Sequence, residues 1–236
     1  MAGLLYAKSV PINDAIQIRI PKMGEVLDSE DEFFGAVSTL IATPYDMMVQ
    51  LDDAGVDFTK INDFELFCLT YRHLREMDTS ILFGDLDFKG FKTAVNQEND
   101  NVVLWNPETN VVIDRVVHDV MATTIRRILH TPKVVKRPGN EEARMYMIER
   151  ARRKQRRMKK KKESPLENYI VALVNNEQFP YDYEGVKDIT IYQFYSSLNQ
   201  IAHKIKYDNT MVGVYAGTIK FDDLSKDDQT WILSQQ

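Results

Sequence analysis

Residues 140–162 of this 236-residue chain form a strongly basic stretch that begins with an asparagine and two glutamates and ends with four lysines. Asn140 is a good N-cap, because its side chain can accept a hydrogen bond from the first turn of a helix. Glu141 and Glu142 lie where the helix dipole favours anions, and the lysines from 159 to 162 lie where it favours cations. This order of charges predicts a single helix about 35 Å long, at about 1.5 Å per residue.

The segments on either side of this helix predict how the chain is divided. Residues 131–139 contain two prolines, three basic residues and a glycine, which is typical of a linker. Ser164 and Pro165 restart the chain with a cap residue and a first-turn proline. We therefore expect an N-terminal α+β domain over residues 1–131, a linker and basic helix over 132–163, and a helical C-terminal domain over 164–236.

The N-terminal part combines strand and helix patterns. Ile16, Ile18 and Ile20 alternate with polar residues, which is the period of a half-buried strand. Valine-rich runs at 102–105 and 111–113 are separated by a five-residue turn and predict a β-hairpin. Cap residues followed by apolar side chains at helical spacing predict helices that begin at Ser29, at Thr43, at Asn62 or Asp63, and at Asp114.

Other stretches complete the expected fold. A turn is expected at residues 22–24, and short apolar runs between 81 and 95, separated by Gly84 and Gly90, predict short strands. In the C-terminal part, apolar spacing predicts one helix from Leu166 and another from Thr190. The last apolar residues are expected to close a second core, namely Phe221, Leu224, Trp231, Ile232 and Leu233.

These patterns together predict a fold class of α+β, mostly α. The N-terminal lobe is helical with a short strand and a β-hairpin, a long basic helix connects the lobes, and the C-terminal lobe is small and all-helical. The composition, with 44% hydrophobic and 28% charged residues, is that of ordinary globular protein.

Charge is distributed unevenly along the chain. Residues 133–162 hold 14 Lys or Arg against three Glu, a local net charge of +11. The rest of the chain holds 16 basic and 32 acidic residues, a net charge of −16. The basic helix is therefore expected to meet an acidic partner, another copy of the chain, or its own body.

The basic helix has two functional interpretations. Ten cations could bind phosphates, but no aromatic residue from Ala151 to Pro165 offers a surface for stacking on bases. A thin neutral seam could instead rest against a partner helix; it comprises Met145, Ile148, Ala151, Gln155 and Met158. A protein partner is therefore favoured over nucleic acid, and the predicted partner-binding residues are Arg150, Arg152, Arg153, Lys154, Arg156, Arg157, Lys159, Lys160, Lys161 and Lys162.

No catalytic, cofactor-binding or metal-binding motif is present in the sequence. Cys68 is the single cysteine, so neither an intrachain disulfide nor a cysteine metal cluster is possible, and it lies in an apolar run typical of a buried, inert thiol. The four histidines are far apart, and the paired aspartates fit turns and caps better than a site. Since no apolar run reaches about 18 residues, we expect a soluble, intracellular protein. Because no catalytic or ligand-binding motif is present, we also expect a protein that is not an enzyme and needs no cofactor or metal.

Several passages resemble the structural and assembly proteins of bacteriophages and prophages, in particular the tail assembly chaperones of long-tailed phages that infect Gram-positive bacteria. The passages are IPKMGEVLDSEDEFFGAV, TPYDMMVQLDDAGVDFTKINDFELF, IYQFYSSLNQI and MVGVYAGTI. The resemblance covers both lobes, and the basic helix departs from the simplest members.

The resemblance implies a non-enzymatic role in the cytoplasm of the host bacterium. Such proteins coat the tape measure protein, recruit tail tube subunits and are absent from the finished particle. We also expect homo-oligomers and no association with membranes. The alternative is a DNA-associated packaging or head-completion factor that uses the basic helix.

Overall fold

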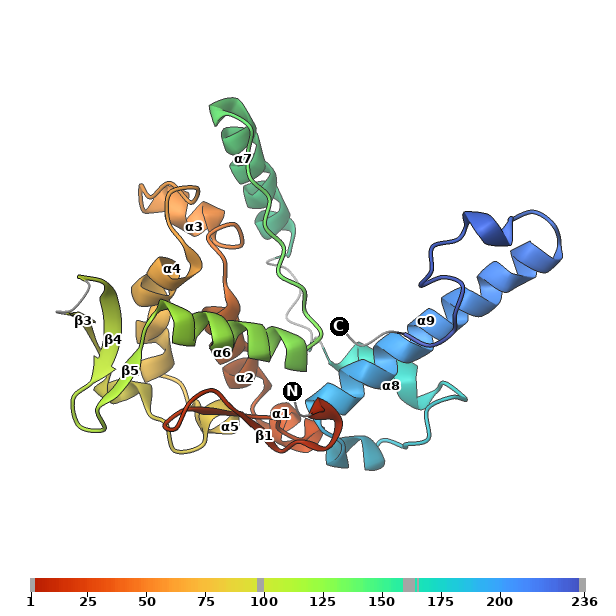
Figure 1. Ribbon diagram of the computed structural model, residues 1–236, viewed down its shortest axis with the longest axis horizontal. Coiled ribbons are helices and arrows are strands. Elements are labelled where there is room, and N and C mark those ends of the chain that lie inside the picture. Colours follow the sequence, from red (N-terminus) through yellow and green to blue (C-terminus); the bar gives the residue numbers. More distant parts are fainter. Residues whose placement is uncertain (1–2, 97–99, 159–163, 165, 234–236) are drawn as a thin grey trace.

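The computed structural model describes residues 3–96, 100–158, 164 and 166–233 (Figure 1). The described residues form nine α-helices and two small antiparallel sheets, and 53% of them are helical. The predicted class, α+β and mostly α, is confirmed. The α-helices are α1 (Met23–Asp28), α2 (Glu30–Ile41), α3 (Met48–Asp53), α4 (Asp63–Thr70), α5 (Ser80–Phe83), α6 (Arg115–Ile128), α7 (Glu141–Met158), α8 (Glu167–Val174) and α9 (Ile191–Tyr215).

The strands form two separate antiparallel sheets. One sheet has two strands and the other has three in the order β3-β4-β5. The predicted strand at 15–20 and the predicted hairpin are confirmed as β2 and as β4 with β5, whereas β1 has no period of its own and pairs with β2 through Val10 opposite Ile18. The strands are β1 (Ser9–Pro11), β2 (Gln17–Arg19), β3 (Lys92–Val95), β4 (Val102–Asn106) and β5 (Val111–Ile113).

Short 3₁₀ helices connect some of these elements. In the described chain they are η1 (Leu4–Tyr6), η2 (Tyr71–Arg75), η3 (Phe88–Gly90), η4 (Gly185–Asp188) and η5 (Phe221–Asp223).

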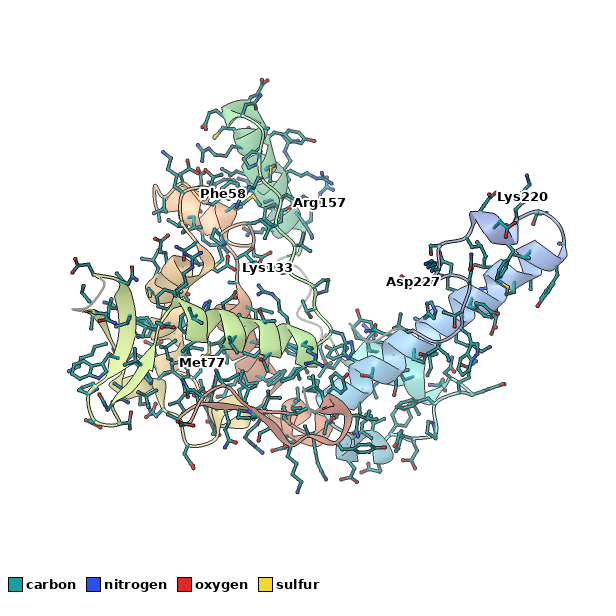
Figure 2. All side chains as sticks on the ribbon, viewed as in Figure 1. Phe58, Met77, Lys133, Arg157, Lys220 and Asp227 are labelled. Carbon is teal, nitrogen blue, oxygen red and sulfur yellow. The ribbon has the colours of Figure 1, made fainter. Side chains whose placement is uncertain are left out.

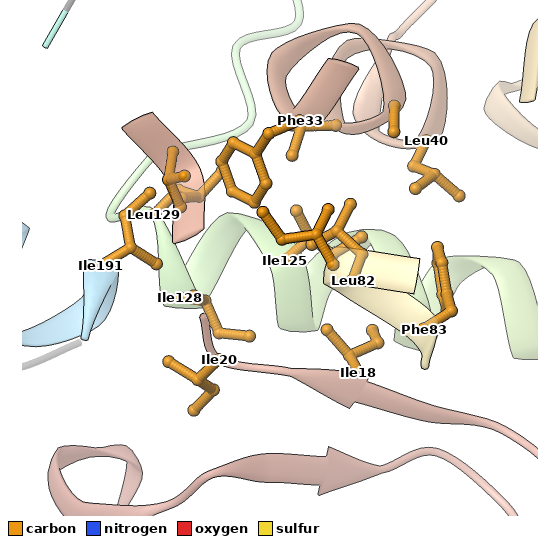
Figure 3. Close-up of a cluster of buried hydrophobic side chains, with 14 of the residues drawn as sticks. Ile18, Ile20, Phe33, Leu40, Leu82, Phe83, Ile125, Ile128, Leu129 and Ile191 are labelled. Atoms are coloured by element: carbon orange, nitrogen blue, oxygen red, sulfur yellow. The ribbon is translucent and has the colours of Figure 1, made fainter. Parts of the chain in front are cut away.

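The main core lies where β2, α2 and α6 meet (Figure 3). Ile18 from β2, Leu40 from α2 and Ile125 from α6 are almost completely buried. These residues reach the core because β2 alternates its side chains and the two helices repeat apolar residues every three or four positions. Burial of each such side chain stabilises the fold by roughly 1.5–3 kcal/mol.

Two polar side chains of α6 are buried against the end of α2. The ring of His118 stacks on Phe67 at 4.5 Å, and its Nε2 lies 3.1 Å from the carbonyl oxygen of Leu40. Arg126 donates to the carbonyl of Ile41. The last carbonyls of a helix have no partner within the helix, so α6 satisfies two that α2 leaves open. Burial lowers the pKa of His118 to about 4, which keeps its ring neutral near pH 7.

The predicted strands between 81 and 95 are mostly wrong. Residues 80–83 form α5, residues 88–90 form η3, and only 92–95 form a strand. The side chains of Asp78 and Asp87 accept hydrogen bonds from the backbone two residues later, at Ser80 and Lys89, which favours turns at both points.

One predicted turn and one predicted helix start are incorrect. The turn expected at residues 22–24 is the beginning of α1. Thr43 bonds to Asp46 within a turn, so α3 begins only at Met48. The helix predicted from Ser29 is confirmed, because α2 begins at Glu30 with Ser29 as its N-cap residue, although Ser29 forms no side-chain capping bond.

Five other predicted caps are confirmed by hydrogen bonds. In each case a side-chain oxygen accepts from a backbone amide two or three residues ahead. These caps are Asn62, Asp114, Asn140, Ser164 and Thr190.

The inner part of the C-terminal segment packs onto the N-terminal part. The amide of Met23 donates to the carbonyl of Ile189 at 2.8 Å, and the amide of Ile191 donates to the carbonyl of Pro21 at 2.9 Å. Buried residues of α8 and α9 belong to the same apolar cluster as those of β2, α2 and α6. The division into residues 1–131, 132–163 and 164–236 stays a prediction, and α8 and α9 share an apolar core with the N-terminal part.

The outer part of the C-terminal segment forms an arm rather than a second core. Figure 1 shows α9 projecting from the body, with the chain after it folding back alongside. Gly217, at a φ of 74°, follows the end of α9. Met211 is buried and Leu224 and Leu233 are half-buried, but Phe221, Trp231 and Ile232 are exposed, so the expected second core is not closed. We call residues 216–233 the return segment; it bonds to α9 through the carbonyl of Trp231, which accepts from Gln200 at 2.7 Å.

Candidate partner-binding surface

The linker before α7 has no regular secondary structure, as predicted for residues 131–139. Its first lysine, Lys133, pairs with Asp63 at 2.5 Å. Asn140 then caps α7 by accepting from the amide of Ala143 at 2.8 Å. Glu141 receives two hydrogen bonds from Arg144, at 2.8 and 2.6 Å, which closes the first turn.

One face of α7 rests on the body through a small apolar cluster separate from the main core. Ile148 is 1% exposed and is the only fully buried side chain of α7 among the described residues. The predicted seam is therefore partly correct: Ala151 and Gln155 are half-buried beside it, but Met145 is exposed. The cluster that receives Ile148 consists of Met48, Val49, Leu51, Phe58 and Leu66.

Arg152 lies at the edge of this docked face. Its guanidinium pairs with Asp52 at 2.7 Å and with Asp53 at 2.6 Å, both at the end of α3. The hydrogen bonds to these two carboxylates raise the pKa of Arg152. Arg152 therefore contacts its own chain, and the aspartates that the sequence suggested were turn or cap residues form its binding site.

The other predicted cations of α7 face outward. Arg153 pairs with Glu149 at 3.2 Å within the helix. Arg150, Lys154, Arg156 and Arg157 are exposed and form no ion pair within the described part of the chain. We call these last four residues the outer cations; Figure 2 labels Arg157 among them. Lys159, Lys160, Lys161 and Lys162 lie outside the described residues.

A cleft of about 790 Å³ separates the linker from the body. Asp57, Asp63 and Asp119 line it together with Arg115, Lys136 and Arg144. Hydrogen bonds from the backbone and side chain of Thr59 lower the pKa of Asp57, and Arg144 also lies 3.8 Å from its carboxylate. Every buried side-chain nitrogen or oxygen of the described residues has a hydrogen-bond partner.

Burial shifts the pKa values of two further side chains, His130 and Cys68. His130 lies 2.9 Å from the hydroxyl of Ser196 and stacks on Tyr192, and burial lowers its pKa. His130 follows the end of α6 and Ser196 lies in α9, and no acidic side chain of the described residues bonds to His130, so the pair has no third member of a catalytic triad there. Burial raises the pKa of Cys68 to about 11, which leaves an unreactive thiol.

The described residues contain no group of three or more His, Cys, Asp or Glu side chains that could hold a metal ion. Among the helices that the structure describes, none has the length and apolar character needed to cross a membrane.

Residues 159–233 match a family model described as the YomV second domain. No curated protein and no solved structure matches the chain. The matched residues include α8, α9 and the return segment, so they cover the C-terminal region and not the surface of α7. YomV is a phage- or prophage-encoded family, and the C-terminal third of this chain therefore resembles a phage protein domain.

Proposed function

We propose that this protein is a non-enzymatic assembly protein of a bacteriophage or prophage that acts through protein–protein contacts. The finer role is the one that the sequence resemblance implies: a tail assembly chaperone that binds tail tube and tape measure proteins in the host cytoplasm. The similarity of residues 159–233 to a phage-encoded domain supports a phage or prophage origin and does not identify a partner.

The observation that carries this proposal is the two-sided character of α7. Its inner face is fixed to α3 by Ile148 and Arg152, while its outer face presents the four outer cations. A single exposed ion pair contributes roughly 0–1 kcal/mol, so useful affinity requires several cations held in one array. The docked helix provides such an array, and arginine is a residue enriched at protein interfaces.

The test is copurification with candidate partners after neutralising the outer cations. The variant carries Arg150→Gln, Lys154→Gln, Arg156→Gln and Arg157→Gln, and leaves Arg152 in place to keep α7 docked. A matched control changes four exposed cations elsewhere that form no ion pair in the described chain: Lys8, Arg72, Arg75 and Lys92, each to Gln.

We expect the outer-cation variant to lose copurification with tail tube or tape measure protein, and the control to retain it. Equal copurification by both variants, each with a native circular dichroism spectrum, would contradict the proposal.

The second candidate is DNA association through the same helix, favoured by the same outer cations. Neutralising four phosphate contacts should reduce the salt dependence of duplex binding by about 0.9 per cation. Sub-micromolar affinity that falls steeply with salt, and that is lost in the outer-cation variant, would support this role. Absence of retention on DNA at low salt would remove it.

A further inference from the structure

The outer half of α9 exposes a row of side chains that continues the buried row of its inner half. Phe194 and Ile201 are buried and Leu198 is partly buried, where α9 packs onto the main core. The spacing from each to the next is four and then three residues, and it continues without interruption along the helix. We call the continuation the α9 seam; it consists of Ile205, Asp208, Val212 and Tyr215.

The α9 seam is open to solvent. Ile205, Val212 and Tyr215 are 44%, 67% and 85% exposed. The return segment bonds to Gln200 and His203, the latter through the carbonyl of Thr230 at 2.8 Å. Because a helix turns about 100° per residue, these two residues lie on the side of α9 away from Ile205 and Val212.

The spacing indicates what kind of surface would cover the seam. Alternation of four and three residues is the pattern by which one helix packs lengthwise against another. The inner half of the row already packs in the main core, and the body ends where the exposed part begins (Figure 1). The missing neighbour is therefore a helix that extends this packing along the arm.

We propose that the neighbour is the α9 seam of a second copy, packed antiparallel in a two-fold symmetric dimer. The charges of the arm permit this pairing, because residues 202–233 hold four Lys and five Asp, a net charge of −1. Residues 141–158 of α7, by contrast, hold seven cations and three Glu, a net charge of +4, so two such helices repel.

Asp208 determines the direction of the pairing. In a parallel pair each seam residue meets its own equivalent, so two Asp208 carboxylates would face each other. In an antiparallel pair Asp208 faces Val212, and Ile205 faces Tyr215. Lys204 lies 2.5 Å from Asp208 in the same helix and neutralises the carboxylate there.

The shape of the molecule agrees with this direction. The arm projects from one end of the body (Figure 1), so antiparallel arms place the two bodies at opposite ends of the dimer. Parallel arms would bring both bodies to the same end, where they would compete for space.

The dimer is tested by light scattering of the full chain over a range of concentrations. We expect a mass twice the 27.4 kDa of the chain. Val212→Asp places a charge in the seam and should raise the dissociation constant at least about 100-fold. Val120→Asp, at an exposed position of α6, is the matched control and should leave the constant unchanged. Asp208→Leu should tighten the dimer about 10-fold, because it removes a charge that the interface would desolvate.

A chain that stays monomeric up to about 100 µM, in the affinity range of weak dimers, overturns the proposal. So does a Val212→Asp dimer as tight as the wild type. The gain expected for Asp208→Leu cannot arise from misfolding, and none of these results depends on the proposed phage role.

Cross-linking tests the direction separately. In a Cys68→Ser background, a mixture of Ile205→Cys and Tyr215→Cys proteins should form a mixed disulfide on oxidation, since the two positions face each other in the antiparallel dimer. Preferential cross-linking of Ile205→Cys to itself would indicate parallel helices and overturn the antiparallel arrangement.

Discussion

The helices α7 and α9 both project from the body, yet they differ in what holds them. α7 is docked by one fully buried side chain, Ile148, and by the ion pairs of Arg152, and its outer face is cationic. α9 is anchored in the main core, and its outer half exposes the α9 seam, which contains three apolar or aromatic side chains and Asp208. The length of a helix therefore does not show which of its faces can bind a partner; the residues that cover each face must be known.

The difference between the two halves of α9 is tested most directly by removing a side chain where α9 packs onto the main core. Phe194→Ala should lower the free energy of unfolding by about 3–5 kcal/mol, because Phe194 is completely buried. Tyr215→Ala, at the exposed end of the same helix, should change it by less than about 0.5 kcal/mol in dilute, monomeric protein. Denaturant unfolding measures both, and similar losses would show that the outer half is also packed in the monomer.

The docking of α7 can be tested in the same way but with a local readout. Ile148→Ala should lower the free energy of opening of α7 by about 2–5 kcal/mol, the range for a buried Ile in a core. Hydrogen exchange should show faster exchange of α7 amides and unchanged exchange in α6. Tyr146→Ala, at an exposed position of α7, is the control. Exchange that is equally fast in both variants would mean that Ile148 does not fix the helix.

Low pH should lower the stability of the body through His118, a buried side chain of α6. The pKa of His118 is about 4 when folded, below its ordinary value of 6.5, so the unfolded chain binds the proton more tightly. The corresponding stability is complete above pH 6.5 and is lost as the pH falls to 4, by up to about 3 kcal/mol. Unfolding of wild type and His118→Gln between pH 7 and 4 measures it. A variant with the wild-type pH dependence would assign the acid sensitivity to other groups.

The smallest effect is expected at the edge of the docked face. Arg152→Gln removes the ion pairs with Asp52 and Asp53 but leaves Ile148 in place. We expect α7 to open more often than in the wild type and less often than in Ile148→Ala, with a difference from wild type that shrinks at high salt. Hydrogen exchange at two salt concentrations tests this, and an effect larger than that of Ile148→Ala would reverse the assigned order.

The parts of the fold that depend on local interactions were predictable from sequence. Asn62, Asp114, Asn140 and Thr190 each bond to the backbone within three residues, so a short window contains all the information. The pairing of Arg152 with Asp52 joins residues 100 positions apart, and no local pattern specifies it.

Two errors have different physical origins. The apolar residues from 81 to 83 are too few to distinguish a strand from a short helix by period, and the turn bonds of Asp78 decided the outcome. The apolar residues between Phe221 and Leu233 suggested a second core. A core also requires a second apolar surface that packs against them. Beyond Ile201 only Met211 is buried among the described residues, so the apolar residues of the arm do not close a second core.

The linker has one further consequence for any partner of α7. Residues 131–139 tether the helix beside its docking site, and a tether of this length holds it at an effective concentration in the millimolar range. A partner that grips α7 on all sides must displace α3 against that concentration, and its apparent affinity falls accordingly. A partner that uses only the outer cations meets no such competition, so the intramolecular dock acts as a selectivity filter that favours one-sided binders.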